Sequence, residues 1–341
     1  MLPKTFASDN YSGVHPEIMD ALISCNEGHA RSYGNDEYTI KAIQTFKKFF
    51  GDEIDVCFVF NGTGANVLGL SSMTDSYNAV LCANTSHVYV DESTAPEKFT
   101  GCRFIPLDTI NGKMSVEEIE KKIKRIGDEH HPQVKVLSLA QTTEYGTVYD
   151  IDELKAISSC LKKHGLFLHM DGARIFNAAV ALNCDLKEFT KDVGVDVLSF
   201  GGTKNGMMFG EAVVFLNNKF SESRKFRQKQ SMQLSSKMRF IAAQFDALLN
   251  NNLWYRNASH ANNMAKLLAK KLEMIPEVII TKPVQANVVF AILPKEFISK
   301  LQELAFFYVW DDKMNEVRLM CSFDTNEDEI NNFIESFKDF N

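Results

Sequence analysis

Short apolar segments alternate with amphipathic segments through the first two thirds of the chain. Between about residues 55 and 216, runs rich in Val, Phe and Leu are separated by stretches whose apolar residues have helical spacing, as in βαβ units. The apolar runs predict seven strands, at residues 56–60, 79–82, 103–107, 134–139, 166–170, 195–199 and 212–216. The pattern therefore predicts an α/β fold with one large, mostly parallel sheet.

The rest of the pattern predicts a second, smaller α/β unit. Beyond residue 220 a helical region runs to about residue 274 with a break near residues 250–252, and strands are expected at 278–281, 287–292 and 317–320. Connecting helices are expected at 115–124, where Ser115 and Glu118 form a capping box, and at 152–163. We expect an N-terminal arm (1–15), a large domain (16–250) and a small C-terminal domain (251–341).

Net charge, apolar runs and the spacing of cysteines and histidines restrict the expected partners, compartment and metal sites. The formal net charge is −7 and the basic residues form no continuous patch, so nucleic acid is not an expected partner. The sequence begins without a secretory pattern and has no run of about 18 apolar residues, so we expect a cytoplasmic protein that does not span a membrane. Seven scattered cysteines and eight histidines show no metal-binding spacing, so reduced thiols and no metal site are expected.

The strongest local signal is the strand at 166–170, which ends in Asp171, Gly172, Ala173 and Arg174. Ligands of open α/β sheets bind at the carboxyl ends of the strands, and a carboxylate there can keep a pyridine nitrogen protonated. The alternative, in which Asp171 only caps the following helix, is about as common for a single motif of this kind.

A second signal is Lys204, which lies among glycines in a loop after the strand at 195–199. A lysine amine that is removed from water loses its proton more readily, as imine formation requires. A solvated loop lysine is the ordinary alternative, but the combination with Asp171 and Arg174 favours a functional role.

Two weaker signals follow other strands. Gly62, Thr63 and Gly64 come after the first strand and before a helical run, where backbone N–H groups can bind a phosphate; a tight turn is the alternative. His87 follows the second strand and can stack on a ring or exchange a proton, although a lone histidine is more often a turn residue.

These motifs, in this order, resemble one enzyme family. The resemblance is carried by Ser8-Asp9-Asn10, Tyr33-Gly34-Asn35-Asp36, Gly62-Thr63-Gly64-Ala65-Asn66, His87, the segment from His169 to Ala178, and Lys204. Together they are similar to the low-specificity threonine aldolases, which belong with the β-eliminating lyases in the aspartate-aminotransferase-like fold of pyridoxal-5′-phosphate (PLP) enzymes. The likeness extends from residue 6 to residue 319.

The resemblance implies a role for each candidate residue. In the cofactor site, Lys204 would carry PLP as an imine, Asp171 would bind the pyridine nitrogen, Arg174 would donate to the ring hydroxyl and His87 would stack on the ring. The phosphate would be held by Gly62, Thr63 and Gly64, and by Arg227 or Lys229 of a neighbouring subunit. The substrate carboxylate would be bound by Ser8, Arg174 and Arg318.

The implied reaction cleaves a β-hydroxy-α-amino acid such as threonine into glycine and an aldehyde, with His87 as candidate base, in a homotetramer with shared active sites. One departure is visible: Glu-Asn-Thr-His is usual after the fourth strand, whereas residues 140–144 here read Ala-Gln-Thr-Thr-Glu. We therefore expect a divergent subgroup. Alternatives are PLP-dependent β-elimination or transamination, a PLP-fold binding module, and a nucleotide-binding α/β protein, which explains fewer residues.

Overall fold

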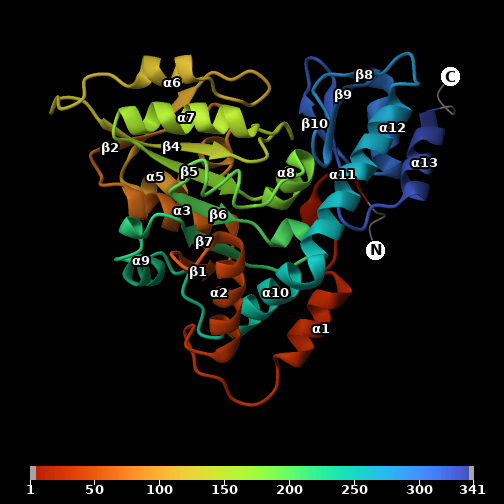
Figure 1. Ribbon diagram of the computed structural model, residues 1–341. Coiled ribbons are helices and arrows are strands. Elements are labelled where there is room, and N and C mark those ends of the chain that lie inside the picture. The colour runs from red at the N-terminus through yellow and green to blue at the C-terminus, as the bar shows by residue number, and fades with distance from the viewer. Residues whose placement is uncertain (1–4, 338–341) are drawn as a thin grey trace.

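The computed structural model describes residues 5–337 and contains two sheets, each covered by helices (Figure 1). The large sheet has seven strands in the order β1-β7-β6-β5-β4-β2-β3. Its strands are β1 (Asp55–Val59), β2 (Asn78–Ala83), β3 (Arg103–Leu107), β4 (Gln133–Ala140), β5 (Phe167–Gly172), β6 (Val197–Phe200) and β7 (Glu211–Phe215). β7 is antiparallel to its neighbours β1 and β6, and the other pairs are parallel. The predicted seven-stranded, mostly parallel sheet is confirmed, with every strand within two residues of its expected ends.

Helices cover both faces of the large sheet. One face packs against α3 (Gly62–Met73), and α3 in turn packs against α5 (Ala95–Thr100) and α9 (Arg224–Gln230). The opposite face and its surroundings carry α1 (Pro16–Ser24), α2 (Glu37–Phe50), α6 (Val116–Lys122), α7 (Ile151–Lys163), α8 (Ile175–Leu182) and α10 (Arg239–Leu249). Small and apolar residues surround the axis of α3, and every residue from Gly64 to Ser71 is buried, as expected for a helix enclosed on all sides.

The small sheet has four antiparallel strands in the order β10-β11-β9-β8. Its strands are β8 (Ile279–Ile280), β9 (Val288–Ile292), β10 (Tyr308–Asp311) and β11 (Glu316–Met320), and its helices are α11 (Leu253–Leu272), α12 (Lys295–Leu304) and α13 (Glu327–Glu335). β10 was not expected from the sequence. It is an edge strand without a fully buried residue, so it lacks the alternation of buried and exposed positions that marks a strand in the sequence.

Short turns complete the chain: α4 (His87–Val90) and the 3₁₀ turns Asp9–Tyr11, Thr203–Asn205, Asn218–Phe220 and Asn250–Asn252. The last of these is the expected break between the two long helices. It forms because Asn251 and Asn252 both adopt positive φ angles of 55°, which asparagine tolerates better than most residues. No helix within residues 5–337 is long and apolar enough to cross a membrane.

Two apolar cores correspond to the two sheets. The first half of α11 contributes Leu253 and Ala258 to the core of the large sheet, and its second half contributes Ala265 and Leu268 to the core of the small sheet. Phe6, near the N-terminus, also packs in the small core. The division at residue 250 stays a prediction, and residues 1–4 of the expected arm lie outside the described chain.

The large core depends on a cluster of phenylalanines around Phe46, whose ring centroid lies 5.0 Å from that of Phe200 and 5.3 Å from that of Phe245. We expect Phe46→Ala to lower the free energy of unfolding by about 3–5 kcal/mol, because it leaves a cavity in a fully buried site. The shift of the urea midpoint measures this loss. Tyr77→Ala, at a side chain that is 66% exposed, is the control, and an equal loss in both variants would contradict the argument.

Candidate active site

The carboxyl ends of the parallel strands bring the candidate residues to one edge of the large sheet. β2, β4, β5 and β6 run in the same direction. Asp171 lies at the carboxyl end of β5, and the loops after β2, β4 and β6 carry His87, Glu144 and Lys204 at the same edge. β1 runs the same way, since both it and β6 are antiparallel to β7. The N-terminus of α3, at Gly62, therefore lies at the same edge.

The loops after β5 and β6 are in direct contact. Gly201 N donates to Gly172 O at 3.0 Å, and a Cβ atom at Gly201 would lie only 2.4 Å from Ala173 O. Only glycine permits so close an approach of two backbones. This contact brings the segments that carry the two strongest sequence signals, Asp171 and Lys204, next to each other.

Lys204 itself is half-buried, and its amine makes no hydrogen bond or ion pair with any described residue. Burial, followed by the positive charge of Arg174, lowers the pKa of Lys204 and outweighs the opposing effect of Asp9 and Asp171. The site therefore favours the neutral, nucleophilic form of the amine.

Glu211 fixes the loop that carries Lys204. Its carboxylate accepts a hydrogen bond from Gly202 N. Burial raises the pKa of Glu211 to about 7, although hydrogen bonds from Thr203 and Gly202 act in the opposite direction. Glu211 is thus a buried carboxyl group within electrostatic reach of the lysine.

Asp171 is held on both oxygens. Oδ1 accepts from Ala173 N at 3.0 Å, which is the local turn contact considered as an alternative role, while Oδ2 accepts from Asn66 Nδ2 at 2.9 Å. Asn66 lies on α3, and its Nδ2 also donates to Glu92 Oε1 at 2.8 Å. Asp171 can therefore accept the local turn contact and also bind a ligand, because the hydrogen bonds from Ala173 and Asn66 fix the orientation of its carboxylate.

The same network reaches His87. Its Nδ1 lies 2.8 Å from Glu92 Oε1, and the Glu92 side chain is fully buried. The hydrogen bond with Glu92 raises the pKa of His87, against the effect of burial. Because Nδ1 is occupied, Nε2 is the imidazole atom left for a ligand.

Arg174 forms a two-pronged ion pair with Asp9. Its Nε and Nη2 donate to the two carboxylate oxygens of Asp9 at 2.7 and 2.9 Å, and Asn287 Nδ2 adds a third donor at 3.1 Å. Burial alone would raise the pKa of Asp9, but the charge and hydrogen bonds of Arg174 outweigh it and leave the pKa lowered. The Nε and Nη2 donors of Arg174 are thus already bonded to Asp9, which the sequence did not indicate.

Ser8 and Arg318 lie beside this pair. Arg318 Nη2 donates to Ala7 O at 3.2 Å, and its guanidinium stacks 5.0 Å from the ring centroid of Trp310. Its Nε is buried and has no partner among the described residues. Burial, and then the charge of Arg174, lowers the pKa of Arg318. An unpaired donor on a cation is suited to an anionic ligand.

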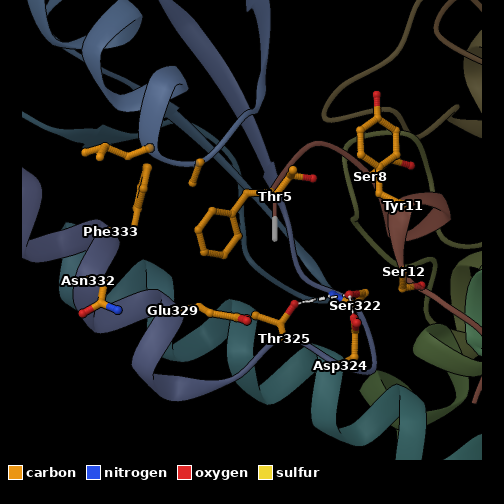
Figure 2. A pocket seen from close by; sticks show the side chains of 13 residues that line it. Thr5, Ser8, Tyr11, Ser12, Ser322, Asp324, Thr325, Glu329, Asn332 and Phe333 are labelled. Atoms are coloured by element: carbon orange, nitrogen blue, oxygen red, sulfur yellow. Dashed lines mark hydrogen bonds between the residues drawn. The ribbon is translucent and has the colours of Figure 1, made fainter. Parts of the chain in front are cut away.

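Ser8 also borders a cavity of about 640 Å³ between the N-terminal segment and the part of the small unit that contains α13 and the end of α12 (Figure 2). Ser8, Tyr11 and Ser12 form one side, and the other side comes from the segment between Ser322 and Phe333. Of the candidate residues within the described chain, only Ser8 lines this cavity. The cavity adjoins the site but does not contain its reactive groups.

The candidate phosphate site lies at the first turn of α3. Asn61 Oδ1 accepts from Gly64 N at 2.8 Å, and the Gln233 side chain packs so tightly on Gly64 that a Cβ atom there would lie 2.4 Å from Gln233 Cδ. At Gly62 the corresponding position is open space. The helix N-terminus is therefore accessible at Gly62, next to Thr63.

Arg227 and Lys229 lie on α9 of the same chain. Arg227 Nε donates to Ser223 Oγ at 2.9 Å, and the exposed Lys229 amine lies 5.3 Å from the ring centroid of Tyr33. A contact of either cation with a phosphate in a neighbouring subunit stays a prediction.

Comparisons with known proteins agree with this arrangement. The model of the β-eliminating lyase family matches residues 5–295. The chain belongs to the β-eliminating lyase family. The chain is 44% identical over 323 residues to a low specificity L-threonine aldolase of Pseudomonas sp. (strain NCIMB 10558). This alignment covers 94% of the chain and 93% of the relative. The resemblance seen in the sequence is therefore confirmed.

Solved structures confirm the fold of this β-eliminating lyase. A threonine aldolase of Leishmania major superposes with a TM-score of 0.93 at 30% identity and covers 99% of both chains. A mutant aspartate aminotransferase of Thermus thermophilus gives a TM-score of 0.71 at 14% identity, with 99% and 96% of the chains covered. The second likeness shows the fold alone, and it confirms the predicted aspartate-aminotransferase-like architecture.

Sequence reasoning missed the partners that hold the site. Asp9 and Asn66 lie within motifs quoted for the resemblance but received no role, and Glu92 and Glu211 gave no signal at all. Glu144 was noted only as part of a departure from the usual motif. Each contacts a residue far away in the chain, such as Arg174 for Asp9, and a single sequence does not reveal such pairs.

The Asp9–Arg174 pair predicts a pH-dependent contribution to stability. Removing one partner of a buried pair costs about 3–5 kcal/mol, so we expect Asp9→Asn to destabilise the protein by that order at pH 7. Because the folded pKa of Asp9 is lowered, the difference from the wild type should be constant above about pH 5 and shrink as the pH falls through the unfolded-state value near 4. Urea unfolding at a series of pH values measures it.

Glu17→Gln is the matched control, because it removes a mostly exposed pair with Arg256 that is worth about 1 kcal/mol or less. A difference between Asp9→Asn and the wild type that grows as the pH falls would contradict the assignment.

Proposed function

We propose that this protein is a PLP-dependent L-threonine aldolase, which cleaves L-threonine, L-allo-threonine and related β-hydroxy-α-amino acids into glycine and an aldehyde. The single observation that carries the proposal is the meeting of Lys204, with its lowered pKa and unbonded amine, and the doubly anchored Asp171 at one sheet edge. The 44% identity to a low specificity L-threonine aldolase over nearly the whole chain supports the choice of reaction.

The donor set fits PLP. A lysine with a lowered pKa suits imine formation with an aldehyde, a fixed carboxylate suits a pyridine N–H, and the accessible first turn of α3 suits a phosphate. We assign Lys204 to the cofactor's carbonyl carbon, Asp171 to its ring nitrogen, and Gly62, Thr63 and Gly64 to its phosphate. When bound, PLP supplies an electron-withdrawing ring that stabilises negative charge at the substrate's Cα.

The remaining residues bind and orient the substrate. Arg318 has a buried donor without a partner and lies with Ser8 beside the N-terminal segment, so these two residues are assigned to the substrate carboxylate. Arg174 adds positive charge there, although Asp9 holds most of its donors. His87, fixed through Nδ1 by Glu92, would place its ring against the cofactor and present Nε2 to the substrate.

The direct test combines Lys204→Ala with product analysis. We expect the variant to lose the visible absorbance of the lysine-bound cofactor and all turnover of L-threonine and L-allo-threonine, because no other described lysine lies in the site. Lys237→Ala, at an exposed position, should behave as the wild type. Retained absorbance and turnover in Lys204→Ala would remove this lysine from its role.

Products from the wild type distinguish the reaction classes. Glycine and acetaldehyde are expected in equal amounts. Ammonia with a keto acid would instead indicate β-elimination, and a keto acid formed only with an acceptor would indicate transamination. Either result would keep the cofactor site and reject the aldolase.

Further features of the protein follow from the same proposal. Seven free cysteines, six of them buried, suit the reducing cytoplasm. The proposed division into an arm (1–15), a large domain (16–250) and a small domain (251–341) is supported by the two apolar cores, although α11 contributes to both. A closed site would form where the two units meet.

We also propose a homotetramer in which α9 forms part of a subunit interface. Phe226 and Met232 are 80% and 70% exposed on and just after α9, beside Arg227 and Lys229, and exposed apolar groups of this kind favour contact with a partner. Phe226→Glu should shift the purified protein from a tetramer to a smaller species in analytical ultracentrifugation. Ile110→Glu, at an equally exposed side chain outside α9, is the control, and no shift with Phe226→Glu would exclude α9 from the interface.

A further inference from the structure

We propose that Glu144 is the catalytic base of the cleavage, taking the proton from the β-hydroxyl of the substrate as the Cα–Cβ bond breaks. This inference rests on the proposed aldolase function and assigns the step for which the chain lacks the usual histidine. Four observations carry it: the position of the loop, the free carboxylate oxygen, the charges around it and the state of His87.

The loop that carries Glu144 is rigid and tied to the cofactor site. It follows β4, and Gln141 N donates to Asp171 O at 2.8 Å. Within the loop, Thr143 N donates to Thr147 O at 3.0 Å, and the two threonine hydroxyl groups lie 2.8 Å apart. Glu144 is thereby held at the same edge as Asp171.

The carboxylate of Glu144 is anchored on one side only. Oε1 accepts a hydrogen bond of 2.8 Å from His87 N, at the start of α4. The backbone N–H of Glu144 also interacts with the carboxylate, but Oε2 makes no hydrogen bond with another described residue, and Glu144 is only half-buried. One oxygen therefore fixes the group beside His87 while the other remains available to a substrate hydroxyl.

The groups around Glu144 bring the pKa of its carboxyl group close to neutral pH. Burial raises the pKa of Glu144 to about 7, with a further rise from Asp171, while the hydrogen bond from His87 N and the charge of His87 act against it. Arg174 is the remaining cation that interacts with it, and the neutral Tyr149 and Cys82 face it as well. A group that is half ionised near neutral pH serves as base in one direction and as acid in the reverse.

His87 is less suited to this step. Its Nδ1 is paired with the buried Glu92, and this contact raises the pKa of His87 and favours the protonated ring. In its protonated form the imidazole donates through Nε2 and has no lone pair to accept a proton, and the raised pKa extends the pH range of that form. His87 would therefore orient the substrate hydroxyl or the cofactor, and Glu144 would accept the proton.

The step balances without a further reactant. The hydroxyl proton moves to Glu144 Oε2, the Cα–Cβ bond breaks, and the C–O bond becomes the carbonyl of the released aldehyde. The electron pair of the broken bond stays with the glycine fragment at Cα, which then takes up one proton. In the reverse direction, protonated Glu144 supplies the proton to the new alkoxide.

Glu144→Gln tests the assignment, because it keeps the acceptor for His87 N and removes the titratable group. We expect kcat for L-threonine cleavage to fall by about 10²–10⁴-fold, the range for loss of a general base. The exchange of the α-protons of glycine with D₂O needs no β-hydroxyl base and should stay within about threefold of the wild type. Glu144→Asp should restore part of the cleavage. Glu118→Gln, an exchange of the same type on the surface helix α6, is the control.

A second readout is independent of turnover. Infrared difference spectra of the cofactor-free protein should show a carboxyl titration near pH 7 that is smaller in Glu144→Gln than in the wild type, because Glu211 contributes in both proteins and Glu144 only in the wild type. The wild-type kcat should rise with pH through about 7, since the ionised form is the base, and this limb should vanish in the variant.

The possible results separate the two proposals. Cleavage by Glu144→Gln within about tenfold of the wild type, or an equal carboxyl titration near pH 7 in the two proteins, would overturn the role of Glu144 and leave the aldolase function standing. A wild type that exchanges glycine protons but releases no aldehyde would overturn both. Loss of cleavage with retained exchange and a smaller titration supports the assignment.

Discussion

The site depends on the contact between the loops after β5 and β6. Gly201 N donates to Gly172 O at 3.0 Å, and the absence of a side chain at Gly201 lets the two backbones approach. The parallel direction of β5 and β6 brings Asp171 and the loop of Lys204 to one edge, and the glycine lets the two backbones pack against each other there. Lys204 thereby lies within electrostatic reach of Asp171.

Charge at this edge is controlled mainly by removal from water. The same cause lowers the pKa of Lys204 and raises those of Glu144 and Glu211 to about 7, because burial always favours the neutral form. Asp9 and His87 are exceptions, since the two-pronged contact of Asp9 with Arg174 and the hydrogen bond of His87 with Glu92 outweigh burial. The edge thus combines one permanently charged pair, which holds the N-terminal segment in place, with neutral or half-ionised groups that can exchange protons.

Much of the fold could be predicted from the sequence because it depends on local patterns. Apolar runs gave all seven strands of the large sheet, and the strand-end positions of Asp171 and Lys204 pointed to a shared site. β10 was missed because an edge strand needs no buried residues. The hydrogen bonds that join Asp171, Asn66 and Glu92 were missed for a different reason. The three residues lie at the end of β5, on α3 and after α4, far apart in the sequence. Only the packing of α3, which is buried from Gly64 to Ser71, brings Asn66 to the other two.

The chain lacks the usual histidine after β4, and under our proposal Glu144 takes its place as the proton acceptor. The contact with Glu92 raises the pKa of His87, so the ring stays protonated to a higher pH than a free imidazole, and in that form it only donates. Glu144, anchored to the backbone of that same histidine, would supply the acceptor. The hydrogen bond with Glu92 raises the pKa of His87 and so stabilises its charged form, while burial raises the pKa of Glu144 to about 7 and so stabilises its neutral form. Such a pair can hold a donor and an acceptor side by side near neutral pH, as reversible carbon–carbon cleavage requires.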